Sequence, residues 1–192
     1  MGSRLGRELS TLPNLLSLSR IGLIYLSAAL MLTGRPLAAV SVGLVAGITD
    51  YLDGWLARRL VQTTDLGAIL DRLSDLVFES TWLVVAVLLG DFSPIVLFLY
   101  LLRELVVLSA RLWCSAHGVS LGSNLLGKLK SNFLGYAGLV VYVAHVPAVA
   151  PAREVFRVLG DVGIAGGLAL SYGSAYDYLR AFARAYDRDS DR

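Results

Sequence analysis

The sequence predicts an all-α protein that crosses a membrane six times and surrounds a polar cavity facing the cytoplasm. Composition is the first indication, because 56% of the 192 residues are hydrophobic and only 17% are charged. Soluble domains average about 45–50% apolar and about 25% charged residues. The second indication is that the apolar residues form long blocks. The third is that carboxylates interrupt two of these blocks, since charges inside membrane helices usually serve a function.

Each of six apolar blocks is long enough for a helix to cross the hydrocarbon core of about 30 Å. The blocks are Leu12–Leu32, Leu37–Ala57, Gly67–Leu89, Pro94–Trp113, Leu125–Val146 and Val155–Leu179. Turn-forming segments separate them, such as TGRP at 33–36 and GDFSP at 90–94. We therefore expect one membrane domain over 1–185, beginning with a short interfacial helix at 1–11, and a polar tail at 186–192.

The basic residues are concentrated on one side of this predicted domain. Arg35, Arg153 and Arg157 fall on one side, whereas both termini and the loops at 58–66 and 117–130 carry most of the others. Cytoplasmic loops of membrane proteins carry an excess of Lys and Arg. We therefore expect both termini in the cytoplasm and the chain in a bacterial inner membrane. The net charge of +2 does not indicate a nucleic-acid partner.

Four aspartates lie near the cytoplasmic ends of the second and third blocks. Asp50 and Asp53 are three residues apart, so they share one face of a helix. Asp71 and Asp75 are four apart and share a face of the next helix. Because the two helices are antiparallel, the four carboxylates can converge, and without a cation they would repel one another. Oxygen ligands suit Mg²⁺ or Mn²⁺, so we expect a site for two such ions, suited to phosphoryl chemistry.

Small residues accompany the aspartates on the same two helices. Gly54, Ala57 and Gly67 leave space in which a phosphate-bearing ligand can approach the backbone. Arg58 follows them, and the planar fork of a guanidinium suits a diphosphate.

Two other interpretations of these residues stay open on physical grounds alone. Intramembrane acids also occur in proton and sodium pathways. They also occur in structural networks, for which Arg20, Arg72 and Arg103 offer partners, and small residues also let helices pack closely. Arg103 adjoins Glu104, with which we expect an ion pair. Glu79 follows the last aspartate by one turn and is either a partner of the site or a helix-packing acid.

The spacing of the aspartates and small residues resembles the signature of the CDP-alcohol phosphatidyltransferases. The run from Asp50 to Asp75 reads D-x₂-D-G-x₂-A-R-x₈-G-x₃-D-x₃-D and agrees with that signature at all eight positions. The resemblance implies an enzyme that moves a phosphatidyl group from CDP-diacylglycerol onto an alcohol and releases CMP. It also implies six membrane spans and, commonly, a homodimer.

The resemblance also implies roles for individual residues. All four aspartates would bind the divalent metals, and Asp75 would in addition act as the general base on the acceptor hydroxyl. The residues that contact the CDP-lipid would be Asn14, Gly54, Ala57, Arg58 and Gly67.

Outside the signature, the chain is similar to the bacterial phosphatidylglycerophosphate synthases of this family. LLRELVVLSAR at 101–111 and GKLK at 127–130 carry that similarity. It implies that the acceptor is sn-glycerol 3-phosphate and the product phosphatidylglycerophosphate. The second phosphate would then be bound by Arg111, Lys128 and Lys130, although the two lysines also suit plain positive-inside anchors.

Two departures from the synthase pattern leave the acceptor open. Arg72 and Leu76 stand where those synthases usually have proline and lysine. The alternatives are the same reaction with inositol phosphate, serine or phosphatidylglycerol as the acceptor. A transporter or scaffold that retained the motif is a further alternative, which predicts no CMP release.

Overall fold

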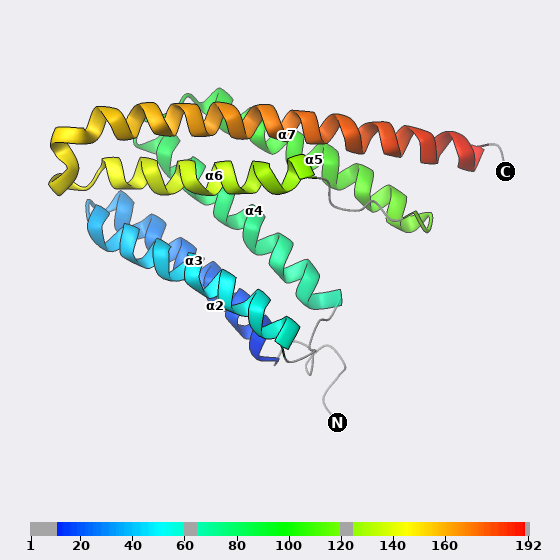
Figure 1. Ribbon diagram of the computed structural model, residues 1–192, viewed down its shortest axis with the longest axis horizontal. Helices are drawn as coiled ribbons and strands as arrows, with labels where there is room; N and C mark the ends of the chain where they lie inside the picture. The colour runs from blue at the N-terminus through cyan, green and yellow to red at the C-terminus, as the bar shows by residue number, and fades with distance from the viewer. Residues whose placement is uncertain (1–10, 60–64, 120–124, 191–192) are drawn as a thin grey trace.

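The chain folds into helices throughout the part that the computed structural model describes, residues 11–59, 65–119 and 125–190 (Figure 1). In chain order the helices are α2 (Leu12–Leu32), α3 (Pro36–Arg59), α4 (Asp65–Leu88), α5 (Pro94–Ala116), α6 (Leu125–Ala144), the 3₁₀ helix η1 (Pro147–Ala152) and α7 (Arg153–Ser190). No strand occurs in these three ranges, so the predicted all-α fold is confirmed. Apart from residue 11, the interfacial helix expected at 1–11 lies outside the described residues.

Each predicted apolar block corresponds to one α-helix, and the turns between them explain where the helices end. Gly34 has φ +74°, and its N–H donates to the Met31 oxygen at 3.1 Å, which closes the turn between α2 and α3. Gly90 has φ +81° after α4. Proline then occupies the first turn of α5, where its missing N–H costs nothing, and Ser93 accepts a hydrogen bond from the Ile95 N–H.

The last helix is longer than its apolar block predicts. α7 continues to Ser190, so the predicted polar tail at 186–192 is helical through that residue. The extension has a packing partner, because Phe182 and Tyr186 lie 5.1 and 5.3 Å from the Trp113 ring of α5, centroid to centroid. Ala and Arg, which are common in this segment, are also good helix formers.

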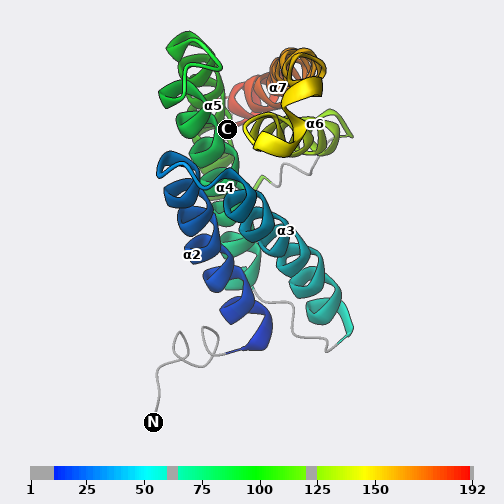
Figure 2. The same cartoon turned by 90° about the vertical axis from the view of Figure 1, so that its left-hand side faces the viewer.

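The helices form two antiparallel hairpins with α4 between them. α2 packs against α3, and α6 packs against α7 along most of its length (Figures 1 and 2). α4 contacts α2 of the first hairpin and α6 of the second, while α5 lies against α4 and α7. The buried core joins these elements through large side chains such as Trp82, Leu83, Tyr100 and Leu134. This arrangement brings α2, α3, α4 and α6 around one space.

Glycines allow the close contact between α6 and α7. A Cβ atom added at Gly163 would lie 2.9 Å from the Ala137 Cβ and 3.3 Å from the Ala137 Cα. One added at Gly167 would lie 2.6 Å from Leu134. Small residues at such positions let helix backbones approach closely, which is a common device for packing helices in lipid.

Replacing Gly163 with alanine should therefore destabilise the protein by about 1–3 kcal/mol, because the neighbouring backbone cannot move aside easily. Thermal unfolding of the purified protein in detergent measures this. Gly22→Ala is the matched control, since nothing lies within 4 Å of a Cβ there and alanine favours a helix. Equal unfolding temperatures for Gly163→Ala and the unaltered protein would contradict the close-packing account.

Two helical segments of the described chain are long and apolar enough to cross a membrane, namely Asn14–Leu32 and Pro147–Asp187. By length and composition, the described residues thus contain two candidate spans, whereas the sequence predicts six. Charged side chains such as Asp71, Arg72 and Asp75 interrupt the apolar sequence of α4. Large apolar side chains are nevertheless exposed on all six α-helices, and examples are Leu26, Ile48, Leu88, Leu105, Leu125 and Val162. Such extensive exposed apolar surface indicates contact with lipid or with other protein.

Candidate active site

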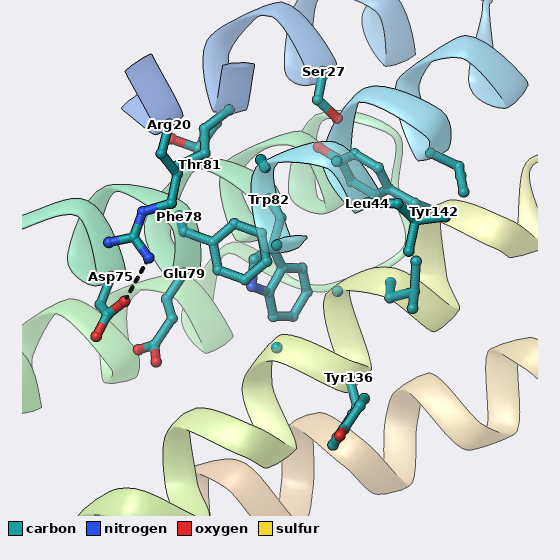
Figure 3. A pocket seen from close by; sticks show the side chains of 18 of the residues that line it. Arg20, Ser27, Leu44, Asp75, Phe78, Glu79, Thr81, Trp82, Tyr136 and Tyr142 are labelled. Atoms are coloured by element: carbon teal, nitrogen blue, oxygen red, sulfur yellow. Dashed lines mark hydrogen bonds and ion pairs between the residues drawn. The ribbon is translucent and has the colours of Figure 1, made fainter. Parts of the chain in front are cut away.

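A cavity of about 670 Å³ lies between α2, α3, α4 and α6. Arg20, Asp75 and Glu79 occupy one end of it (Figure 3). The rest of the wall is mostly apolar and includes Leu44, Phe78, Trp82, Leu139 and Tyr142. The cavity therefore suits an elongated molecule with a charged group at one end and an apolar remainder.

Asp71 and Asp75 of α4 both pair with Arg20 of α2. Arg20 Nη2 lies 3.6 Å from Asp71 Oδ1, and Arg20 Nη1 lies 3.4 Å from Asp75 Oδ1. The Arg20 side chain is only 5% exposed, whereas those of Asp71 and Asp75 are 56% and 50% exposed. The guanidinium is thus a buried positive charge behind two carboxylates that a ligand can reach. The expectation that the four-residue spacing places these aspartates on one helix face is confirmed.

The first half of α2 packs against α4 through a polar face. Asn14, Ser17 and Arg20 are spaced by three residues, and all three are buried. Ser74, which lies between the two aspartates on α4, donates a hydrogen bond to the Ser17 backbone oxygen at 3.1 Å. The spacing of these polar residues is the sequence signal by which Arg20 could have been assigned to the site, not only to a structural network.

Behind Asp75, a buried network of charges connects α4, α5 and α6. Lys130 Nζ lies 2.7 Å from Glu79 Oε2 and 2.8 Å from Glu104 Oε1. The Tyr100 hydroxyl donates to Glu79 Oε2 at 2.9 Å. Arg103 pairs with Glu104 at 2.6 Å, which confirms that expected ion pair, and its Nε donates to the Ser171 backbone oxygen of α7 at 2.9 Å.

Two of the residues expected to bind an acceptor phosphate, Arg111 and Lys130, do not line the cavity. Two carboxylates hold the buried ammonium of Lys130. Arg111 lies at the contact between α5 and α7, where it hydrogen-bonds to the Tyr178 hydroxyl and its guanidinium lies 4.4 Å from the centre of that ring. The side chain of Lys128 lies outside the described residues.

Comparison with known protein families shows to which family the chain belongs. Residues 10–169 match the model of the CDP-alcohol phosphatidyltransferase family. The chain belongs to this family. The match covers α2 to α6 and the first half of α7, so it includes all the residues of the signature and of the cavity.

Several relatives are similar to this phosphatidyltransferase over most of its length. The CDP-diacylglycerol–glycerol-3-phosphate 3-phosphatidyltransferase of Bacillus subtilis is 31% identical over 184 residues, which is 88% of this chain and 93% of that protein. The enzyme of the same name from Aquifex aeolicus is 30% identical over 154 residues, 79% of this chain and 86% of that protein. The cardiolipin synthase (CMP-forming) of Rattus norvegicus is 37% identical over 102 residues, but these are 52% of this chain and 33% of that protein.

Of the signature residues whose side chains are described, Asp75 lines the cavity, at its polar end (Figure 3). Gly47 and Ile48 of α3 line the cavity, and the same helix continues through Asp50 and Asp53 within two turns. Gly67 lies one turn before Asp71 on α4. The side chains of Asp50, Asp53, Ala57 and Arg58 and the surroundings of Gly54 lie outside the described residues. Asn14 is buried on the face of α2 that carries Arg20.

Carboxylate oxygens at this end of the cavity are suitable ligands for a divalent cation. Asp71 and Asp75 are accessible and one helical turn apart. Among the described side chains, no three His, Cys, Asp or Glu residues are grouped closely enough to hold a metal ion. Further ligands would have to come from α3, where the signature places Asp50 and Asp53. Carboxylate oxygens are the kind of donor that Mg²⁺ and Mn²⁺ prefer.

Proposed function

We propose that this enzyme transfers the phosphatidyl group of CDP-diacylglycerol to sn-glycerol 3-phosphate, which gives phosphatidylglycerophosphate and CMP. The observation that carries the proposal is the position of Asp75, an accessible carboxylate of the family signature at the polar end of an otherwise apolar cavity. Relatives that cover most of the chain and carry the name of this reaction support the choice of acceptor.

The proposed setting is a bacterial inner membrane. All six α-helices would span it, because each has about the necessary length and exposes large apolar side chains. Both termini and the polar end of the cavity would face the cytoplasm, in agreement with the distribution of Lys and Arg. We place two copies together as a homodimer, whose contact would use part of the exposed apolar surface.

The shape and lining of the cavity support a position for the lipid donor. Its diphosphate would lie at the polar end, near Asp75 and Arg58, with the cytidine near Gly54 and Gly67. The acyl chains would follow the apolar wall past Phe78 and Trp82 and reach the bilayer between helices.

In the proposed reaction, Asp75 takes the proton from the acceptor hydroxyl group. The resulting oxygen forms a bond to the lipid-side phosphorus. The bond from that phosphorus to the bridging oxygen breaks, and CMP leaves with the electron pair. Arg58 would offset part of the charge on the departing phosphate.

The proposed cofactor is a pair of Mg²⁺ or Mn²⁺ ions held by Asp50, Asp53, Asp71 and Asp75. When bound, such ions neutralise the diphosphate and make its phosphorus more electrophilic. The carboxylates of α4 would hold the ions at the polar end of the cavity, where Arg20 pairs with both of them.

An acceptor screen tests this proposal. The purified protein in detergent receives CDP-diacylglycerol and Mg²⁺, and CMP release is followed with glycerol 3-phosphate, inositol phosphate, serine or phosphatidylglycerol. We expect glycerol 3-phosphate to give a kcat/KM at least about tenfold above the others, because polar groups placed for glycerol 3-phosphate stay unpaired with alcohols of a different shape. Preference for phosphatidylglycerol would instead indicate a cardiolipin synthase, the activity that the rat relative is named for.

A further inference from the structure

We propose that Glu79 selects the acceptor by accepting a hydrogen bond from its second hydroxyl group, the one that does not react. For glycerol 3-phosphate this is the hydroxyl on the middle carbon. The inference rests on the proposed function and adds a specificity-determining residue outside the family signature.

The position of Glu79 places its carboxylate beside the reacting group. Glu79 follows Asp75 by four residues on α4, which is one turn and about 6 Å along the helix axis. Both side chains line the cavity and lie at its polar end (Figure 3). An alcohol whose reacting hydroxyl is at Asp75 would therefore have its neighbouring carbon within reach of Glu79.

The bonding of Glu79 determines which chemical group it can recognise. Lys130 and Tyr100 both donate to Oε2, at 2.7 and 2.9 Å. No described residue forms a hydrogen bond or ion pair with Oε1, so this oxygen is left for a ligand. A carboxylate paired with a lysine is only an acceptor. It would bind a hydroxyl group, which can donate, and would repel a phosphate.

The network behind Glu79 keeps its carboxylate in one orientation. Lys130 is held at once by Glu79 and Glu104, and Arg103 anchors Glu104 and reaches α7. A buried set of charges of this kind is weak evidence for stability, because apolar side chains of the same volume often stabilise a core as well or better. The network meets the cavity through Glu79, which indicates a role in placing this carboxylate against a ligand.

The test compares two acceptors that differ only in the middle hydroxyl group. These are glycerol 3-phosphate and 3-hydroxypropyl phosphate, which retains the reacting hydroxyl and the phosphate. In the unaltered enzyme we expect kcat/KM to favour glycerol 3-phosphate by about 10- to 100-fold, the value of a hydrogen bond to a charged group. In Glu79→Met this preference should fall to about threefold or less, with 3-hydroxypropyl phosphate used almost as before.

Two further variants keep the result interpretable. Glu79→Gln retains the shape of the side chain but removes its charge, so it should give an intermediate preference even if Glu79→Met does not fold. Glu154→Gln makes the same change at an exposed position of α7, outside both the network and the cavity lining, and should leave the preference unchanged. The inference is wrong if the unaltered enzyme uses both acceptors equally, or if the preference persists in the Glu79 variants. No CMP release by the unaltered enzyme with either acceptor would instead overturn the proposed function and, with it, this inference.

Discussion

Replacing Asp75 with asparagine should lower the rate of CMP release from CDP-diacylglycerol by about 10²- to 10⁴-fold, the usual contribution of a general base. Asparagine has the same shape but cannot take up the acceptor proton. The side chain is 50% exposed and pairs with Arg20 only at 3.4 Å, so its loss should cost little stability. CMP release in detergent and thermal unfolding, measured on the same preparation, separate the two effects.

Asp161→Asn is the matched control for this variant, because Asp161 is an exposed aspartate of α7 that does not line the cavity. It should retain the full rate. A rate for Asp75→Asn within about tenfold of the unaltered enzyme would contradict the assignment of Asp75 as the base.

Removing divalent cations should abolish CMP release, and adding Mg²⁺ or Mn²⁺ should restore it. The carboxylates of the signature would otherwise face the diphosphate of the lipid with like charge, and Arg20 can offset only one of these charges. The measurement is the rate after dialysis against a chelator, followed by titration with each ion.

Asp71→Asn offers a second measurement on the metal site. It removes one proposed ligand and keeps Asp75, so the concentration of Mg²⁺ that gives the half-maximal rate should rise by about tenfold or more. Undiminished CMP release from chelator-treated protein would contradict the metal assignment, whereas the position of Asp75 in the cavity would still stand.

The helices and one half of the candidate site could be predicted from local sequence. Apolar blocks bounded by turn residues such as Gly34 and Gly90 determine six α-helices, because helix length and turn chemistry are local properties. The four-residue spacing of Asp71 and Asp75 likewise determines that they share a helix face, whatever the rest of the fold. The helical extension of α7 could not be predicted from hydropathy, since its segment is polar and its ring contact with Trp113 joins residues far apart in the sequence.

The partners of the charged residues could not be predicted, because they depend on how each helix is rotated against its neighbours. The sequence predicts that Lys130 binds a phosphate or anchors the chain at the membrane surface. In the structure its side chain is buried and pairs with Glu79 and Glu104. Arg111 similarly lies against Tyr178 of α7, a residue 67 positions away. The spacing of Glu79 is compatible with a partner of the site or with a helix-packing acid. Only the packing of α4 against α5 and α6 places it at the cavity wall.

The most direct measurement follows the acceptor into the lipid product. Purified protein receives CDP-diacylglycerol, Mg²⁺ and isotopically labelled glycerol 3-phosphate, and mass spectrometry identifies the lipids while CMP is quantified. We predict labelled phosphatidylglycerophosphate in equal amount to CMP. CMP formed without label in any lipid, or no CMP from a folded protein that binds the CDP-lipid, would contradict transfer to glycerol 3-phosphate at this cavity.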